Sequence, residues 1–184
     1  MDAIAMLKAD HAEVEKLFKR FEKLGPRAKK TKADIADKVI TALSQHAVIE
    51  EQLLYPTVRE RLPDEDDLVL EALEEHHVAK WLLSELDDLT PDDERFDAKF
   101  TVLAESDRHH VKEEEGELFP KLRREFTKGE LEELGQALAA AKEVAPTRPH
   151  PRAPDEPPGN LIATAAQAPF EVARKAVRAV AGEL

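Results

Sequence analysis

The chain has 184 residues, and its 27 Lys and Arg against 39 Asp and Glu give a formal net charge of -12. Nucleic acids and anionic membranes bind clustered positive charge, so this acidic balance argues against both as partners. The chain contains no cysteine, which excludes thiolate metal sites and thiol nucleophiles, and it lacks a signal-peptide pattern, so we expect a soluble, cytoplasmic protein.

Apolar residues at three- and four-residue steps predict a series of amphipathic helices. The stripes end at Gly25-Pro26, at Pro63-Asp64 and at Thr90-Pro91, and no convincing strand pattern appears between them. The four long apolar stripes occupy residues 4–24, 35–58, 69–89 and 96–122.

Two capping signals indicate where helices begin. Thr90, followed by Pro91 and Asp93, predicts the start of the fourth helix. Thr127 with Glu130 predicts the start of a shorter fifth helix. Four long helices with short connections favour an all-α, up-down-up-down antiparallel four-helix bundle with this additional short helix.

Proline divides the chain, because half of its 12 prolines lie between residues 146 and 158. We therefore expect residues 1–145 to form the folded body, residues 146–159 an extended linker and residues 160–184 an amphipathic tail helix. The tail is expected to dock on the bundle or to join two copies of the chain as a homo-oligomer. Membrane-surface attachment is the weaker alternative, because its polar face has few basic residues.

Four histidines interrupt the apolar stripes in phase with them, one on each long helix. A buried imidazole is costly unless its ring finds a strong partner. Two of the four have a glutamate four residues later, which places each pair on one helix face. The resulting set is His11, His46 with Glu50, His76, and His110 with Glu114.

The body has the pattern of a duplicated helix pair. Residues 46–56 (HAVIEEQLLYP) and 110–120 (HVKEEEGELFP) share His, two Glu, Leu, an aromatic residue and Pro in the same register. Each histidine also stands at a similar distance from its interhelical loop, so the four are expected at similar levels along the bundle axis. Four imidazoles and two carboxylates suit a pair of first-row transition ions such as iron, manganese or zinc, with the carboxylates bridging them.

With these motifs, the sequence resembles the hemerythrin-like HHE cation-binding domain over roughly residues 1–145. The resemblance implies a non-haem centre of two iron ions, oxo- or hydroxo-bridged, with His11 and His46 on one ion and His76 and His110 on the other. Oxygen-carrying members add a histidine one turn from His76, where this chain has Ala72 and Lys80. The missing ligand favours sensing, redox or peroxide chemistry over stable oxygen carriage.

We therefore predict a di-iron protein that binds or reacts with dioxygen, peroxide or nitric oxide. If it is an enzyme, the resemblance suggests peroxide disproportionation or nitric oxide reduction. Two alternatives remain: a sensor module for oxygen, nitric oxide or iron that turns nothing over, and a structural zinc-binding or metal-free bundle.

Adjacent histidines compete for two of the ligand positions. We prefer His76 to His77 because this choice keeps Lys80 off the inward stripe. His110 is preferred to His109 because it repeats the register of His46.

Other polar side chains near the motifs have two interpretations each. Asp107 either hydrogen-bonds a ligand imidazole or lies at the surface, Tyr55 either packs in the core or serves as an extra ligand or redox group, and Trp81 belongs to the core or an interface. The remaining glutamates are expected on a hydrated face, unless the helices unwind near Pro56 and Pro120: Glu51, Glu113, Glu115 and Glu117.

Overall fold

The computed structural model describes residues 1–153. The predicted tail helix and most of the predicted linker lie outside the described residues, so those two predictions remain untested. None of the helices within the described part combines the length and apolarity needed to cross a bilayer.

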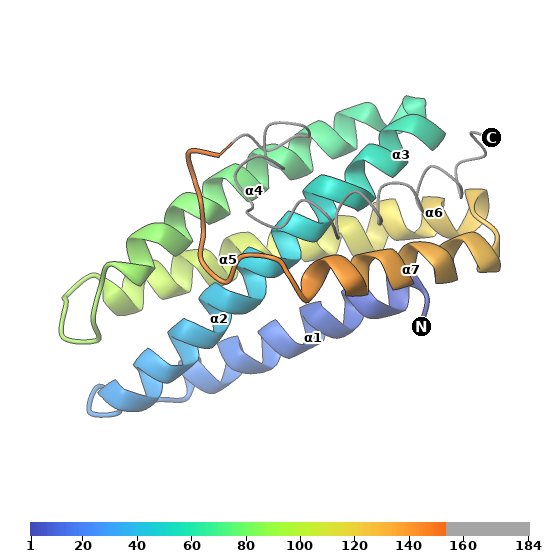
Figure 1. Ribbon diagram of the computed structural model, residues 1–184. Coiled ribbons are helices and arrows are strands. Elements are labelled where there is room, and N and C mark those ends of the chain that lie inside the picture. Colours follow the sequence, from blue (N-terminus) through green and yellow to red (C-terminus); the bar gives the residue numbers. More distant parts are fainter. Residues whose placement is uncertain (154–184) are drawn as a thin grey trace.

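Four long helices form the bundle, and they alternate in direction along the chain (Figure 1). They are α1 (Ala3–Glu22), α2 (Lys29–Ile49), α4 (Asp66–Asp87) and α5 (Phe96–Glu113). Helix α1 packs on α2, α4 packs on α5, and contacts of α2 with α4 and of α1 with α5 close the bundle. Residues 1–153 contain no strand, which confirms the predicted all-α antiparallel bundle.

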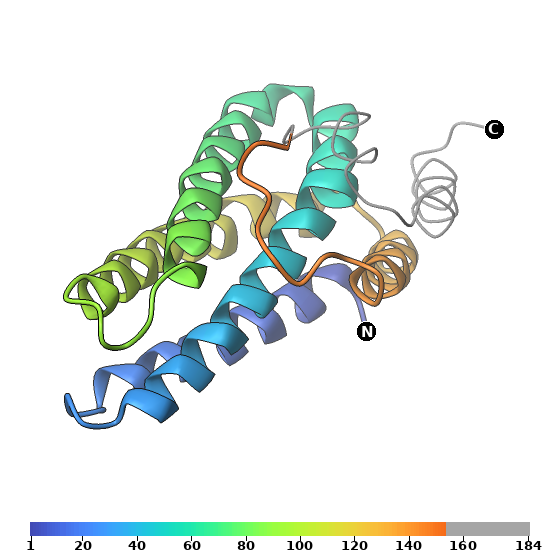
Figure 2. The same cartoon turned by 60° about the vertical axis from the view of Figure 1, so that its left-hand side comes forward.

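Helices α2 and α5 each continue through one π-helical turn into a further helix. The π-turns are η1 (Glu50–Leu54) and η3 (Glu114–Leu118), and they lead into α3 (Tyr55–Arg61) and α6 (Phe119–Glu125). A short 3-10 turn, η2 (Pro63–Glu65), then connects α3 to α4. The seventh helix, α7 (Lys128–Lys142), packs on α1 and α2 beside the chain's N-terminus (Figure 2).

The π-turns have a local cause in the sequence. Pro56 and Pro120 have no backbone N–H, and a proline ring in a regular α-helix collides with the carbonyl four residues earlier. The N–H of Tyr55 instead donates to the carbonyl of Glu50, and that of Phe119 donates to the carbonyl of Glu114. These five-residue steps widen both helices directly after the two motif glutamates.

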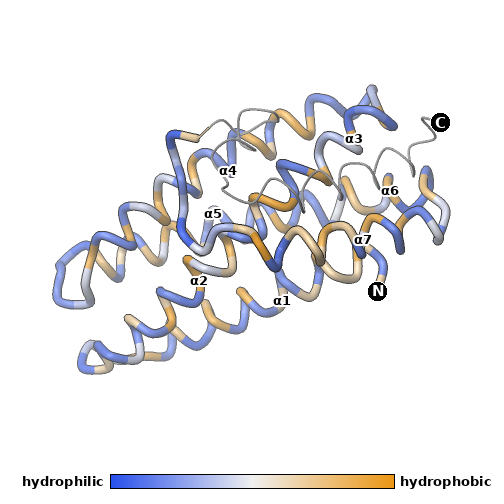
Figure 3. The backbone as a smooth tube through the Cα atoms, in the orientation of Figure 1, coloured by the Kyte–Doolittle hydropathy of each residue, from blue (hydrophilic) through white to orange (hydrophobic). Residues whose placement is uncertain are grey.

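Apolar side chains form two separate clusters along the bundle. One cluster contains Phe18, Phe100 and their neighbours, and the other contains Leu7, Leu53 and the buried face of α7. Along each tube in Figure 3, hydrophobic and hydrophilic residues alternate as amphipathic helices require. On α1, α2 and α4, the motif histidine lies between the stretches that belong to the two clusters, and on α5 the second stretch begins beyond the helix, at Leu118 of η3.

The two predicted helix starts have different outcomes. The capping box of Thr127 and Glu130 is confirmed, since each side chain binds the other residue's backbone N–H. The predicted start at Thr90 is wrong, because α5 begins at Phe96. The backbone N–H and hydroxyl of Thr90 do donate to the Asp93 carboxylate, but this closes a turn within the loop. The longer loop brings His110 to the level of the other histidines.

Trp81 lies on the outer face of α4. The prediction of a core position is wrong, because 40% of the residue is exposed. Its indole N–H donates to Nε2 of His77, one turn earlier on the same helix, at 3.2 Å. The alternative of an interface with another molecule stays a prediction.

Close packing of α7 on the N-terminus of α1 makes Gly135 a testable position. A Cβ at Gly135 would lie 2.5 Å from the carbonyl oxygen of Met1 and 2.8 Å from the backbone nitrogen of Ala3. We expect Gly135→Ala to lower the free energy of unfolding by about 1–3 kcal/mol, because both contacts are with backbone atoms. Urea denaturation would measure the change.

Gly129, in the first turn of the same helix, is the matched control. A Cβ there meets no heavy atom within 4 Å. Gly129→Ala should therefore raise the free energy of unfolding by about 0.5–1 kcal/mol, since alanine loses less conformational entropy in a helix. Equal effects of the two substitutions would contradict the proposed packing.

Candidate metal centre

The four motif histidines meet in the middle of the bundle as two pairs. Nε2 of His11 lies 3.1 Å from Nε2 of His46, and Nε2 of His76 lies 3.2 Å from Nε2 of His110. All four residues are buried. Neighbouring helices thus supply each pair, α1 with α2 and α4 with α5.

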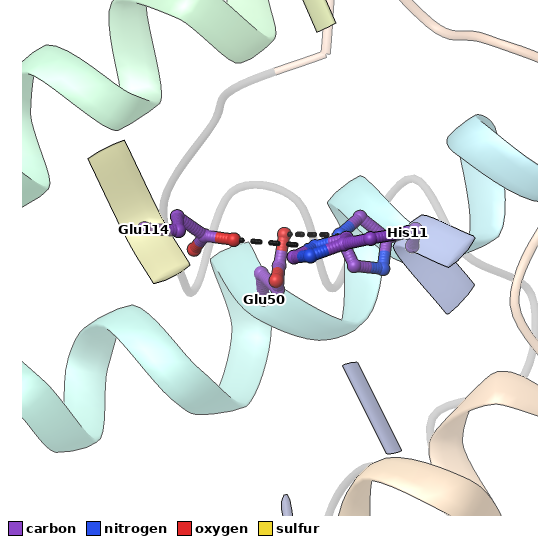
Figure 4. A group of neighbouring side chains, drawn as sticks. His11, Glu50 and Glu114 are labelled. Carbon is purple, nitrogen blue, oxygen red and sulfur yellow. Dashed lines mark hydrogen bonds and ion pairs between the residues drawn. The ribbon is translucent and has the colours of Figure 1, made fainter. Parts of the chain in front are cut away.

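Each motif glutamate reaches one histidine of each pair. Oε2 of Glu50 lies 3.1 Å from Nε2 of His46 and 3.5 Å from Nε2 of His76. Oε2 of Glu114 lies 3.4 Å from Nε2 of His11 and 3.7 Å from Nε2 of His110. Both carboxylates point toward His11 in the bundle interior (Figure 4). The structure therefore brings all six predicted residues together.

The opposite nitrogen of each imidazole faces an acid. Three Nδ1 atoms lie at hydrogen-bond distance from a carboxylate, those of His11, His76 and His110. Their partners are Glu115 at 3.0 Å, Glu51 at 3.0 Å and Glu75 at 2.8 Å. Because an ionised carboxylate only accepts hydrogen bonds, we assign the ring hydrogen to Nδ1. A neutral imidazole then directs a lone pair from Nε2 into the centre.

The fourth histidine has a looser arrangement. Nδ1 of His46 lies 3.6 Å from Oδ2 of Asp10. That same carboxylate oxygen lies 2.6 Å from Nζ of Lys142 on α7. Helix α7 thereby contributes a charge to the support of the centre, although none of its residues faces the interior donors.

The inward-facing atoms are almost all electron-pair donors. Within the described residues, three buried carboxylate oxygens accept no hydrogen bond: both oxygens of Glu50 and Oε2 of Glu114. Glu50 is 0% exposed. Buried lone pairs without partners are costly. A cation between them removes that cost, and mixed imidazole and carboxylate donors suit a first-row transition ion. The cluster is therefore able to bind metal.

Electrostatics separates the two glutamates when no cation is considered. Burial raises the pKa of Glu50 well above its ordinary value, and the charge of Glu114 raises it further. Burial also acts to raise the pKa of Glu114, but the nearby His110, His11 and His46 outweigh it and lower that pKa. Without a cation, a proton on Glu50 therefore neutralises the buried carboxylate, as a metal ion would in its place.

Glu51 and Lys80 form a buried ion pair behind His76. The two Glu51 oxygens lie 2.7 and 2.8 Å from Nζ of Lys80, and both residues are buried. The expected hydrated position of Glu51 is wrong, because the π-turn directs its side chain inward. The expected outward position of Lys80 is also wrong: Lys80 lies one turn after His76 on the buried face of α4, and Glu51 neutralises its charge there. His76 nevertheless faces the centre, whereas His77 is only half-buried.

Tyr55 belongs to the site as well as to the core. It is 1% exposed, and its hydroxyl donates to Oε1 of Glu114 at 3.1 Å. The Tyr55 hydroxyl oxygen also lies 3.3 Å from Nε2 of His76. The π-turn that ends at Tyr55 thus places a phenol among the inward-facing donors. The packing interpretation is confirmed, and a role as an extra ligand or redox group stays a prediction.

Asp107 fits neither interpretation drawn from the sequence. None of the hydrogen bonds within residues 1–153 joins it to an imidazole, yet it is only half-exposed. Burial raises its pKa to about 6, against the opposing effect of His110 and His11. Asp107 instead lies between two cavities.

The inner cavity adjoins the histidines and has a volume of about 30 Å³. Its walls are mainly apolar, formed by residues such as Leu43 and Leu83, with His76 and Asp107 among the polar ones. The outer cavity, of about 240 Å³, lies between α1 and α5 and is more open. Asp107 lines both cavities, while His11, Val111 and Glu115 line the outer one.

Sequence reasoning missed Asp10 and Glu75, and overlooked a repeated signal. In each half of the duplication, an acid directly precedes the lone histidine, as in Asp10-His11 and Glu75-His76. These acids support the imidazoles of His46 and His110. A second acid directly follows each motif glutamate, and these two, Glu51 and Glu115, support histidines of the opposite half. The remaining predicted glutamates, Glu113 and Glu117, lie toward solvent.

Comparisons with known proteins agree with this geometry. The sequence is 29% identical over 133 residues to an uncharacterized hemerythrin-like protein of Schizosaccharomyces pombe, covering 72% of this chain and 66% of that protein. It is 27% identical over 137 residues to a DNA nickase of Nostoc, covering 74% of this chain and 38% of the nickase. The chain thus spans less than two thirds of either relative.

A solved structure shares the fold. The hemerythrin HHE cation binding domain-containing protein of Mycobacterium kansasii superposes with a TM-score of 0.66 and 24% sequence identity, covering 78% of this chain and 86% of that one. The sequence model of the hemerythrin HHE cation binding domain matches residues 2–122, which contain all six motif residues. This chain belongs to the hemerythrin HHE cation-binding domain family.

Proposed function

We propose that the chain holds two iron ions, one between His11 and His46 and the other between His76 and His110. The observation that carries this proposal is that Oε2 of Glu50 and Oε2 of Glu114 each lie within 4 Å of one imidazole from each pair. A carboxylate shared in this way suits two ions better than one. Bound iron would supply a redox-active Lewis acid.

The protein's own part is to orient the donors and limit what reaches them. The acids behind the imidazoles fix the ring orientation and raise the basicity of Nε2. Roughly 10–15 Å³ suffices for one water molecule, so the cavity of about 30 Å³ admits a ligand of very few atoms. We infer that the ligand is dioxygen, peroxide or nitric oxide.

The position of Lys80 favours reaction over reversible oxygen carriage. It stands one turn after His76, where an additional histidine would face the centre, and its ammonium group pairs with Glu51. A protonated lysine cannot bind a metal. Fewer imidazole ligands leave coordination positions to the small molecule, which suits peroxide disproportionation or nitric oxide reduction.

We do not propose nickase activity for this chain, although the Nostoc relative is a DNA nickase. The chain spans only 38% of that protein. Its formal charge of -12 opposes phosphate binding by the surface as a whole. A sensor that captures its ligand without turnover, and a structural zinc site, are the alternatives that experiment must separate.

Removing a shared carboxylate tests the metal assignment. We expect Glu50→Ala and Glu114→Ala to lose most bound iron, together with the near-ultraviolet absorption of a ferric pair, because each deletion removes a ligand from both ions. Elemental analysis and optical spectra of purified protein would measure both losses. Circular dichroism should still show a helical protein.

Glu117→Ala is the matched control, since Glu117 lies in the same π-turn as Glu114 but is exposed. Its iron content should equal that of the unaltered chain. Unchanged iron in Glu50→Ala and Glu114→Ala would refute the assignment, and stoichiometric zinc in place of iron would support the structural alternative.

Peroxide chemistry and its access route can be tested together. Iron-loaded protein should convert two molecules of hydrogen peroxide into one of dioxygen and two of water. Val111→Trp, which fills part of the outer cavity, should slow oxygen release several-fold without changing iron content. An oxygen electrode would follow the reaction.

Val102→Trp is the control for this substitution, because Val102 is 50% exposed on the same helix and does not line the cavity. Its rate should remain that of the unaltered chain. Absence of oxygen release from all iron-loaded variants would favour the sensor, and equal rates in both tryptophan variants would place the access route elsewhere.

A further inference from the structure

A second group of metal-binding side chains lies on the outer surface of α4 and α5. It consists of Glu75, His109 and Glu113, each of which offers one donor atom within 4.8 Å of the others. The His109 side chain is 59% exposed, and those of Glu113 and Glu75 are 34% and 18% exposed. The proposed iron centre uses neither His109 nor Glu113.

The donor spacing suits coordination better than hydrogen bonding. Nε2 of His109 lies 3.5 Å from Oε1 of Glu75 and 3.4 Å from Oε1 of Glu113. Both separations exceed the 2.7–3.2 Å usual for N–H···O hydrogen bonds. Tetrahedral ligands with bonds of about 2.0–2.2 Å stand roughly 3.4 Å apart. Both histidine–carboxylate separations therefore match the spacing of two ligands on one transition ion, and the three residues offer donor atoms within 4.8 Å of one another.

Glu75 connects this group to the interior. Its Oε1 faces His109, while its Oε2 accepts a hydrogen bond from Nδ1 of His110 at 2.8 Å. The carboxylate that would bind an ion at the surface is thus the same one that supports the inner His110. The chain's net negative charge also attracts cations to this exposed position.

We propose that Glu75, His109 and Glu113 form a separate surface site for a divalent transition cation, completed by water, that captures the ion and passes it to the buried centre. Its binding step stands independently of the proposed iron chemistry. One imidazole and two carboxylates suit Zn²⁺, Co²⁺ or Fe²⁺.

Zinc stoichiometry tests capture. In equilibrium dialysis with Zn²⁺, the unaltered chain should bind one ion more than His109→Ala or Glu113→Gln. Glu75 stays unaltered, because its loss would also disturb His110. His150→Ala is the control, since His150 is an exposed histidine outside the group, and it should bind as much zinc as the unaltered chain.

This difference separates failure of the surface site from failure of the proposed function. If the buried centre bound no metal, the unaltered chain would hold one zinc and the His109→Ala variant none, which still supports the surface site. Equal zinc binding by the unaltered chain and both variants would overturn it. Circular dichroism should show that both variants are folded.

Loading kinetics test delivery. When Fe²⁺ is added in air, the absorption of the ferric centre should develop several-fold more slowly in His109→Ala than in His150→Ala, and reach the same final intensity. Equal loading rates would overturn the delivery step.

Discussion

The structure depends on holding a set of lone pairs toward one another inside an apolar bundle. The lone pairs of four imidazoles and two carboxylates repel one another there and lack hydrogen-bond donors. Acids on the outer side of the rings hold the imidazoles in this orientation. The acids at Nδ1 of His11, His76 and His110 do so by hydrogen bonds of 2.8–3.0 Å. Two apolar clusters lie on either side of the histidine level. The unsatisfied lone pairs therefore lower the free energy of unfolding without a cation, and a bound cation would raise it.

The sequence predicts the inward donors well because helical periodicity determines which residues share a face. Periodicity favoured His76 over His77, the repeated register favoured His110 over His109, and the structure places both chosen rings inside. Periodicity fails where the helix is not regular. The π-turn at residues 50–54 directs Glu51 inward, and only then does burial of Lys80 become favourable, because an isolated buried ammonium would be far too costly. The inward position of Glu51 does not follow from a 3.6-residue repeat, whereas that of Lys80, one turn after His76 on a regular helix, does.

Loops and outer faces were the other source of error. Thr90 has the chemistry of a helix cap and does bind Asp93, but the level of His110 requires α5 to begin later, and that constraint is tertiary. Trp81 was expected in the core or at an interface, and its place on α4 falls on the outer face. The acids that support the rings had a sequence signal, a repeated acid directly before each lone histidine and directly after each motif glutamate, which is recognisable only once the partner helix is known.

The departures from the duplication give the two halves of the centre different surroundings. The duplication itself produces the symmetric donors, since each half supplies a histidine, then a histidine with a glutamate. Lys80 is the counterpart of Glu15 in the first half. On the second half, Lys80 and Tyr55 fill the space beside His76 with buried groups. On the first, Glu15 turns outward to Arg108, at 2.8 Å, and the cavity between α1 and α5 reaches His11. Repetition produced the inward-facing donors, and divergence at a few neighbouring positions accompanies the outer cavity beside His11.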